Sequence, residues 1–529
     1  MQIVPAHIFF VALPLVAVLP APRASAASCE GLVALKLPNT TITAAESVRT
    51  GTFTPPYGNP IDKLPGFCRI AGVIQPTNDS YIHFEVWLPA ADWNEKFLGV
   101  GNGGFAGSID YGSLARNVKR GYSTAATDTG HEGDAVDASW AFRHPEKVID
   151  FGYRALHATT ENAKLIIQSF YSRPPRRSYF DSCSDGGREA LMEAQRFPDD
   201  FDGILAGAPA NFWTHMVASG IDVGQAMYRN PAAYISDIKL PAITRAVLAA
   251  CDLQDGAKDG IINDPLHCRF DPSVLLCHGT ESRTCLTSPQ ITALKKLYAG
   301  GQDSHGNQIF PGFIPGGENS GWAQWIVGPG PGGSAGTAYG ENYFRYMVFE
   351  DPTWNALTAN VDLAEKRADE KTARALNATD PDLSRFQARG GKLILYHGWN
   401  DPAISPLNTI NYYNSVLKVE GTQQAESFVR LYMIPGMQHC LGGPGASSFG
   451  QLGTTTTKGQ EHGIYAALEE WVEKNTPPGD VIGTKYIDDS PAKGAMLTRP
   501  ICPYPQVAKY NGSGAVTDSA SFVCTASTQ

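Results

Sequence analysis

The chain has 529 residues, of which 43% are apolar and 18% charged, and a formal net charge of −10. This apolar share is typical of globular proteins and excludes a disordered or fibrous chain. The 54 glycines and 37 prolines predict many loops, and the length predicts one large domain with an insertion, or two to three domains. No basic run is longer than that at 173–177, so we do not expect nucleic acid as a partner.

The N-terminal residues have the features of a secretory signal peptide. Residues 8–19 are almost wholly apolar, and the Ala-Ser-Ala sequence at 24–26 matches a cleavage site. This apolar run is too short to cross a bilayer, although only His7 and the α-amino group precede it, in place of the usual Lys or Arg. We therefore predict that residues 1–26 are removed, that the mature chain begins near Ala27, and that it is secreted to the periplasm or the medium.

The ten cysteines support export. Their number is even, and no C-x-x-C or zinc-finger spacing occurs, so we expect five disulfides rather than a structural zinc site. The sequence alone does not fix their connectivity. Pairing of nearest neighbours suggests four bridges, Cys29–Cys68, Cys251–Cys268, Cys277–Cys285 and Cys502–Cys524. It leaves Cys183 and Cys440 as a long-range pair.

From about residue 80 the hydrophobic pattern alternates strands with helices. In chain order the pattern predicts strands at 83–88, 96–100 and 123–127, a helix at 155–170, a strand at 178–181, a helix at 186–196 and a strand at 203–206. Short apolar strands that alternate with helices favour a parallel sheet covered by helices on both faces.

The alternation stops at about residue 211 and returns after residue 385. The intervening segment contains Gly/Pro tracts and is interpreted as a domain inserted into the sheet. After it we expect a strand at 392–396, a helix at 406–417, a strand at 428–434 and a helix at 463–474. The predicted organisation is a catalytic domain formed by 27–210 and 386–529, interrupted by a lid domain at 211–385.

A candidate nucleophile lies between the strand at 178–181 and the helix at 186–196. There the chain reads Tyr-Phe-Asp-Ser-Cys-Ser-Asp-Gly-Gly-Arg-Glu, with Ser184 at the turn and Gly186 after it. A strand, a serine at a tight turn and a helix form the nucleophile elbow. The motif match is imperfect, because Ser182 stands where G-x-S-x-G has its first glycine.

Two downstream segments supply the partners that a nucleophilic serine needs. Asp401 follows the strand at 392–396, and His439 follows the strand at 428–434. Serine is a weak nucleophile until an imidazole accepts its proton, and a carboxylate holds that imidazole in the required tautomer. The order Ser, Asp, His is that of an α/β-hydrolase, so we predict a triad of Ser184, Asp401 and His439.

Three other histidines are alternative bases. His397 is interpreted as a structural residue beneath the site, His131 lies at a different strand end, and His462 is expected to open the last helix. An oxyanion hole needs two N–H donors. We assign one to Asp185, directly after the nucleophile, and the other to Gly104, with Gly103 as the alternative.

With these motifs the chain resembles the tannase/feruloyl esterase family of α/β-hydrolases, which includes the bacterial mono(2-hydroxyethyl) terephthalate hydrolase. The most specific marks are a cysteine directly before the nucleophile, Cys183, and another directly after the histidine, Cys440. The resemblance implies that the two form a disulfide beneath the triad. It also implies an α/β-hydrolase fold with a large inserted lid domain.

The resemblance further implies a structural calcium site in the lid. The segment from Cys251 to Pro265 carries alternating acids in a glycine-containing loop, which suits a hard cation with oxygen ligands. The expected ligands are three carboxylates and two backbone carbonyls, from Asp252, Asp255, Asp259, Ala257 and Ile261.

The resemblance implies a small ester of an aromatic acid as substrate, such as a hydroxycinnamate, a gallate or a terephthalate half-ester, including esters attached to plant polysaccharide or polyphenol. Ile404 stands where the terephthalate enzyme has an aromatic residue, which argues against that specificity. Candidate pocket residues are aromatic, namely Phe105, Trp322, Trp325, Tyr343, Phe344 and Trp399. Two further hypotheses are a cysteine hydrolase that uses Cys183 and a non-catalytic binding module.

Overall fold

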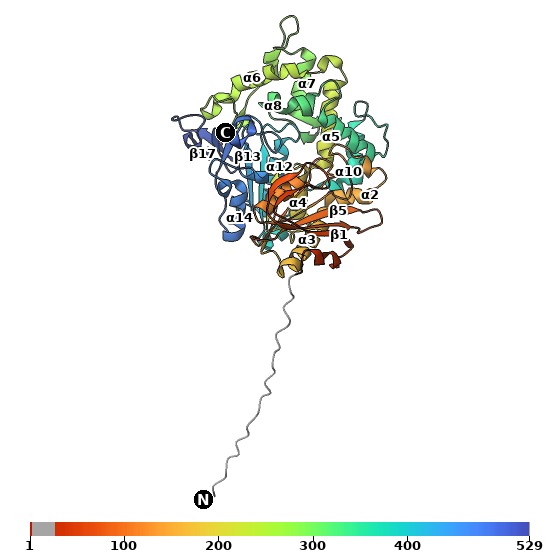
Figure 1. Cartoon of the computed structure of the whole chain (residues 1–529). Helices are drawn as coiled ribbons and strands as arrows, with labels where there is room; N and C mark the ends of the chain where they lie inside the picture. Colours follow the sequence, from red (N-terminus) through yellow and green to blue (C-terminus); the bar gives the residue numbers. More distant parts are fainter. Residues whose placement is uncertain (3–26, 528–529) are drawn as a thin grey trace.

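A mixed nine-stranded sheet forms the centre of the molecule in the computed structural model, which describes residues 1–2 and 27–527 (Figure 1). The rest of the predicted signal peptide lies outside the described residues. The strands are, in spatial order, β1 (Thr40–Val48), β4 (Phe67–Ile74), β5 (Ile82–Pro89), β7 (Ser123–Thr127), β6 (Lys96–Gly99), β8 (Arg177–Cys183), β9 (Gly203–Gly207), β12 (Lys392–Gly398) and β13 (Val429–Ile434).

The strands from β7 to β13 are parallel, whereas β1, β4 and β5 pair antiparallel. The prediction of a parallel sheet is therefore correct for one part of the sheet and wrong for the other. The connection from β4 to β5 is too short for a crossover helix, so this pair forms a hairpin. The prediction missed β1 and β4 altogether.

Helices cover both faces of the sheet, as predicted. Tyr179 and Phe180 are neighbours on β8 and point to opposite faces, since side chains alternate along a strand. Phe180 packs with α3 (Ala155–Tyr171), α4 (Asp185–Arg196) and α12 (Pro406–Glu420). Tyr179 packs with α14 (Ile464–Lys474), and α1 (Tyr111–Lys119) covers β5 and β7 on that same face.

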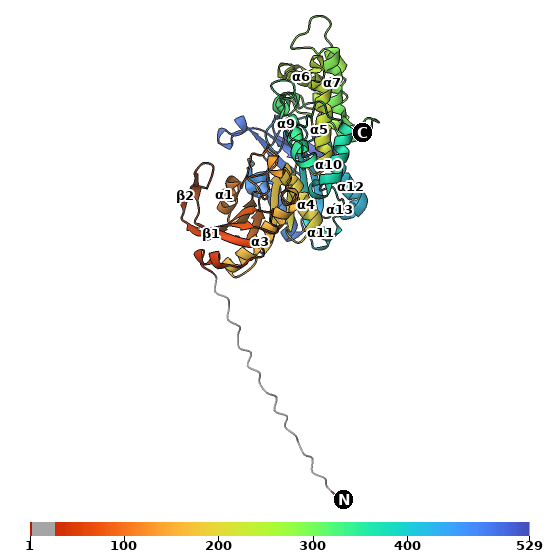
Figure 2. The ribbon, with the colours of Figure 1, turned by 90° about the vertical axis from the view of Figure 1, so that its right-hand side faces the viewer.

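The segment between β9 and β12 adds no strand to the central sheet. Its α6, α7 and α8 lie above the sheet in Figure 1, and Figure 2 shows the same arrangement from the side. Its elements are α5 (Trp213–Tyr228), α6 (Leu240–Cys251), α7 (Ser288–Ala299), β10 (Gly300–Gln302), β11 (Gln308–Pro311), α8 (Glu318–Trp322), α9 (Ala335–Asn342), α10 (Val361–Leu376) and α11 (Ser384–Ala388). We call this segment the lid; its boundaries at 211 and 385 stay a prediction.

Small elements complete the fold. They are the hairpins β2 (Gly51–Phe53) with β3 (Ile61–Leu64), β14 (Val481–Tyr486) with β15 (Ala495–Ile501), and β16 (Gln506–Tyr510) with β17 (Phe522–Ala526), and the short helices α2 (Pro145–Ile149) and α13 (Thr422–Ala425). The two C-terminal hairpins were not predicted.

All ten cysteines are paired, in the connectivity that nearest-neighbour pairing suggested. The Cys183–Cys440 bridge spans 257 residues with a Cα–Cα distance of 6.0 Å. Across the described residues, none of the helices is both long and apolar enough to cross a membrane.

Candidate active site

Ser184 lies at a sharp turn between β8 and α4, with φ +68° and ψ −122°. Residues other than glycine rarely adopt a positive φ, so the packing around the turn must hold this conformation. The following glycines allow it: a Cβ at Gly186 would collide with Ser182 Oγ, and one at Gly187 with the carbonyl of Gly207. Ser182 itself belongs to β8, and its extended backbone does not require glycine. The turn therefore has the geometry of a nucleophile elbow despite the imperfect motif.

A continuous chain of hydrogen bonds joins the three residues predicted as a triad. Ser184 Oγ lies 2.8 Å from His439 Nε2, and His439 Nδ1 lies 2.7 Å from Asp401 Oδ2. Asp401 follows β12 and His439 follows β13, so adjacent parallel strands deliver both to one edge of the sheet. An imidazole between a hydroxyl and a carboxylate can accept the hydroxyl proton.

Asp401 is fully buried and well supplied with hydrogen-bond donors. Its Oδ1 accepts from the backbone N–H groups of Ala403 and Ile404, at 2.8 and 3.0 Å. Burial alone would raise the pKa of Asp401, but the charge of His439 and the hydrogen bonds of His397 and His439 outweigh it and hold that pKa well below its usual range. The carboxylate therefore stays ionised.

His397 lies beneath this carboxylate, in agreement with its interpretation as a structural residue. Its Nε2 is 3.0 Å from Asp401 Oδ2, and its Nδ1 is 2.8 Å from Thr409 Oγ1. His131 is elsewhere: its Nε2 is 2.7 Å from the carbonyl oxygen of Phe105, and burial lowers its pKa to about 4. His462 lies in a short 3₁₀ turn just before α14.

The two residues assigned to the oxyanion hole border the same cavity as Ser184 and His439. Asp185 opens α4, so its N–H points from a helix N-terminus. Gly104 has φ +59°, and a Cβ there would collide with the carbonyl of Ala135. Glycine is thus required at this turn, while Gly103 has open space around it.

Two hydrogen bonds join α4 to the glycine-rich turn that follows β6 and carries Gly104. The N–H of Gly186 donates to the carbonyl of Asn102 at 2.8 Å, and the N–H of Asn102 donates to Glu189 Oε2 at 2.8 Å. These bonds fix the turn that carries Gly104 relative to the helix that carries Asp185.

An apolar cavity of about 1100 Å³, its open mouth included, begins at Ser184 and extends under the lid. Of the predicted pocket residues, Phe105, Trp325 and Ile404 line it. Trp399, Trp322, Tyr343 and Phe344 are instead buried in the protein core. Further lining side chains are Trp213, Met216, Val217, Val223, Met227, Leu297, Phe310, Phe313, Ile326 and Tyr339. Among the described residues no Lys or Arg borders this cavity.

Tyr339 is a pocket residue that the sequence reasoning missed. Its ring stacks on Trp325 at 5.7 Å and lies 5.3 Å from Phe105, and Trp325 meets the ring of His439 edge to face at 5.8 Å. Tyr339 lies on α9 in the lid, where no strand–helix alternation or motif marks it in the sequence.

A second, more polar cleft opens on the other side of Ser184 and His439. It is bordered by polar and charged side chains, namely Asn102, Ser108, Asp110, Ser113, Arg116, Asp181, Ser182 and Thr454. The serine hydroxyl thus lies between an apolar cavity and a polar cleft.

The predicted calcium ligands lie on one loop at the end of α6, in which the side chains of Asp252, Asp255 and Asp259 are buried. Asp252 accepts from the N–H groups of Asp259 and Gly260, at 3.3 and 3.0 Å, and Asp259 forms an ion pair with Arg499 of β15. Within the part of the chain that the structure describes, Asp252 and Asp255 have no cationic partner within ion-pair distance. Burial raises the pKa of Asp255 to about 6.

This donor set fits a hard dication in charge and chemistry, since Asp252 and Asp255 are buried and form no ion pair among the described residues. The buried Oδ1 of Asn263, beside Asp255, also has no hydrogen-bond partner. The carboxylate oxygens do not converge within 4.8 Å of one another as they stand. Among the described residues the group that does so is His157, Glu193 and Asp200.

The sulfur of Cys183 is bonded to Cys440. A cysteine nucleophile needs a free thiolate, so the hypothesis of a cysteine hydrolase is wrong for this structure. Both cysteines pack against the same core as Tyr396 and Met437, at the edge of the sheet where Ser184 and His439 meet.

The central sheet, the helices on its two faces and the turn at Ser184 define an α/β-hydrolase fold. The family model described as "Tannase and feruloyl esterase" matches residues 68–525. The chain is 44% identical to an uncharacterized esterase of Xanthomonas campestris pv. campestris, over 94% of this chain and 91% of that protein. It is 36% identical to a protein of Aspergillus flavus named probable feruloyl esterase B-2, over 82% and 83% of the two chains.

Solved structures agree with these relatives. Feruloyl esterase B from Aspergillus oryzae superposes with a TM-score of 0.86 at 31% identity, over 94% of this chain and 99% of that one. Tannin acyl hydrolase from Aspergillus niger, at 23% identity, shares the fold with a TM-score of 0.71 over 92% of each chain. The chain belongs to the tannase and feruloyl esterase family. It is a carboxylic ester hydrolase, which excludes the non-catalytic module.

Proposed function

We propose that this chain is a secreted serine esterase that hydrolyses esters of aromatic acids through an acyl-enzyme on Ser184. The observation that carries the proposal is the hydrogen-bonded chain from Ser184 through His439 to Asp401, placed at the mouth of an apolar, aromatic-lined cavity. The family and its feruloyl esterase relatives support the same class of substrate.

In the first half-reaction, Ser184 Oγ attacks the ester carbonyl while its proton moves to His439 Nε2. The N–H groups of Gly104 and Asp185 stabilise the negative charge that develops on the carbonyl oxygen. His439 then returns the proton to the departing alcohol, which leaves the acyl group on Ser184. In the second half-reaction water attacks this acyl-enzyme, again deprotonated by His439, and releases the carboxylic acid. Asp401 stabilises the imidazolium throughout.

The two spaces beside Ser184 favour one orientation of the ester. The aromatic acyl group fits the apolar cavity, where Phe105, Trp325 and Tyr339 present their rings. The alcohol, including a sugar, fits the polar cleft with Arg116 and Asp110. A terephthalate half-ester would bring a carboxylate into a cavity without a lining cation, and burial of an unpaired charge is costly. We therefore favour hydroxycinnamoyl and similar uncharged aryl esters.

A panel of methyl ferulate, methyl gallate and mono(2-hydroxyethyl) terephthalate tests this function. We expect the highest kcat/KM with methyl ferulate, the lowest with the half-ester, and near-complete loss with Ser184→Ala. More than about a tenth of the activity left in Ser184→Ala would overturn the nucleophile, since removal of a triad serine costs about 10⁶ in kcat. Preference for the half-ester would overturn the assignment of the apolar cavity.

We also propose that the acidic loop of the lid binds a structural Ca²⁺. Asp252, Asp255 and Asp259 would supply carboxylates, and Ala257 and Ile261 backbone carbonyls, while the ion would supply the missing positive charge. Chelation should lower the Tm of wild type, and Asp255→Ala should remove this sensitivity. The exposed acid Asp271, which follows the same disulfide loop, gives a matched control as Asp271→Ala. Protein purified without chelator that contains no calcium would contradict the site.

Export is proposed from the predicted signal peptide and supported by the five disulfides. N-terminal sequencing of protein from the medium or periplasm should begin near Ala27. An intact N-terminus in the cytoplasmic fraction would contradict it.

A further inference from the structure

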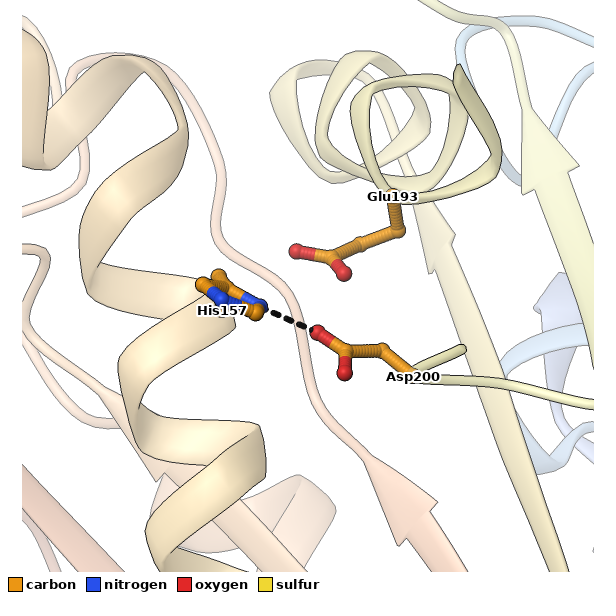
Figure 3. Close-up of side chains that lie close together, drawn as sticks. All are labelled: His157, Glu193 and Asp200. Atoms are coloured by element: carbon orange, nitrogen blue, oxygen red, sulfur yellow. Dashed lines mark hydrogen bonds and ion pairs between the residues drawn. The ribbon is translucent and has the colours of Figure 1, made fainter. Parts of the chain in front are cut away.

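A second group of ionisable side chains lies away from the active site, on the face of the sheet that α3 and α4 cover. Figure 3 shows His157 on α3, Glu193 on α4 and Asp200 in the loop after α4 converging on one point. His157 Nδ1 is 2.6 Å from Asp200 Oδ2, and one ligand atom from each residue lies within 4.8 Å of the other two.

Glu193 is the unusual member of this group. The residue is only 1% exposed, its side chain points toward His157 and Asp200 (Figure 3), and neither carboxylate oxygen has a hydrogen-bond partner among the described residues. Burial, followed by the charge of Asp200, raises the pKa of Glu193 well above its usual value. A buried carboxylate without a donor is costly, so a proton or a cation must compensate it.

Nearby charges do not supply that compensation. Lys164 is 3.8 Å from Asp200 Oδ1 and donates to the carbonyl of Asp199 at 3.1 Å. Its charge lowers the pKa of Glu193, but by less than burial, Asp200 and Glu189 each raise that pKa. Glu189, one turn earlier on α4, adds a further acid that raises the pKa of Glu193. Glu193 therefore faces a second carboxylate and an imidazole.

The surroundings of His157 match those of a metal ligand. Metal-bound histidines generally donate their second ring N–H to a carboxylate, and His157 Nε2 lies 3.5 Å from Glu161 Oε2. The ring of Phe197 stacks on the imidazole at 3.8 Å and fixes its plane. The His157 side chain is 26% exposed, which leaves a path for an ion from solvent.

We propose that His157, Glu193 and Asp200 bind a first-row transition-metal dication, for which Zn²⁺ is the matching probe. Imidazole nitrogen and carboxylate oxygen are both donors that Zn²⁺ accepts, and water would fill a remaining position. The ion would join α3, the end of α4 and the loop to β9. Glu193 is about 14 Å from Ser184 along α4, at about 1.5 Å per residue, so the role is structural.

Zinc titration of the metal-stripped full-length protein, in excess Ca²⁺ to saturate the acidic loop, tests the proposal. We expect one Zn²⁺ equivalent and an increase in Tm for wild type. Glu193→Gln and His157→Gln should each weaken binding by more than about tenfold, a loss typical even of outer-shell changes. Co²⁺ in place of Zn²⁺ should give visible absorption bands that both variants lose.

His144→Gln is the matched control, because His144 is paired with Asp79 at 2.7 Å but belongs to no group of three ligand side chains among the described residues. It should bind zinc as wild type does. Absence of zinc binding in wild type, or equal binding in His157→Gln, would overturn the proposal. In that outcome a proton shared between Glu193 and Asp200 compensates the buried charge. His157→Gln alters a partly exposed residue, so the test holds even if Glu193→Gln fails to fold.

Discussion

The carboxyl ends of the central strands and the lid contribute to the active-site cavity in different ways. The strand ends contribute the groups of the proposed chemistry, and each is fixed by several hydrogen bonds, as Asp401 is by four donors. The lid contributes aromatic side chains, such as Trp325 and Tyr339, and aliphatic ones. They shape the cavity but form no hydrogen bond with Ser184 Oγ among the described residues. Changes at the strand ends should therefore lower turnover of every ester, whereas changes in the lid should alter the ratio between esters.

After loss of the nucleophile itself, the largest effect is expected at Asp401. Asp401→Asn should lower kcat about 10⁴-fold, because an amide does not hold His439 in the tautomer that accepts the serine proton. The loss should be equal for methyl ferulate and p-nitrophenyl acetate in steady-state assays. A loss confined to one of these esters would break the distinction between the two regions.

The bridge between Cys183 and Cys440 should have the next largest effect on kcat. It joins residues adjacent to Ser184 and His439, so Cys183→Ala/Cys440→Ala should misplace the imidazole and lower kcat about 10²-fold. Far-UV circular dichroism should stay close to that of wild type. The lid bridge gives the matched control: Cys277→Ala/Cys285→Ala should keep its kcat. Full activity in the first double variant would show that the bridge is incidental to catalysis.

In the lid, Trp325→Ala should raise KM for methyl ferulate about tenfold, which corresponds to about 1.4 kcal/mol of lost aromatic contact. The kcat/KM for p-nitrophenyl acetate should change little, since an acetyl group does not reach the stacked rings. Trp325→Phe keeps an aromatic ring, so its KM for methyl ferulate should lie between those of wild type and Trp325→Ala. Equal losses for both esters would mean that Trp325 acts through His439 instead.

The smallest expected effect is on the pH dependence of the folded protein's stability, through Glu189 of α4. Burial and the charge of Asp185 raise the pKa of Glu189 to about 8. A carboxyl whose pKa is higher in the folded state binds its proton more tightly there, so wild-type stability should fall as pH rises from about 4.5 through about 8. Glu189→Gln lacks this ionisation and still accepts from Asn102, so its Tm relative to wild type should increase over that range. A Tm difference between Glu189→Gln and wild type that does not change with pH would contradict this prediction.

The sequence predicted the strand ends well because two simple signals coincide there. Apolar runs mark the buried parallel strands, and such strands carry Ser184, Asp401 and His439 to one edge whatever the intervening chain does. Predicted and observed bounds of β7 are identical, and those of β12 differ by two residues at one end.

The lid and the outer strands lack those signals. Tyr339 reaches the cavity through packing of α9 against Trp325 and Phe105, and nothing in local periodicity encodes such contacts. The same holds for Arg499 of β15, which pairs with Asp259 from across the sequence. β1 and β4 were missed because antiparallel strands need no helix between them, so no alternation of strand and helix marks them.

The central claim, an acyl-enzyme on Ser184, is tested most directly by acid quench of the reaction with p-nitrophenyl ferulate and peptide mass mapping. We expect the mass of a feruloyl group on the peptide that contains Ser184, and its absence in Ser184→Ala. A feruloyl adduct on another residue, or a pre-steady-state burst of nitrophenol without an adduct on Ser184, would contradict the account.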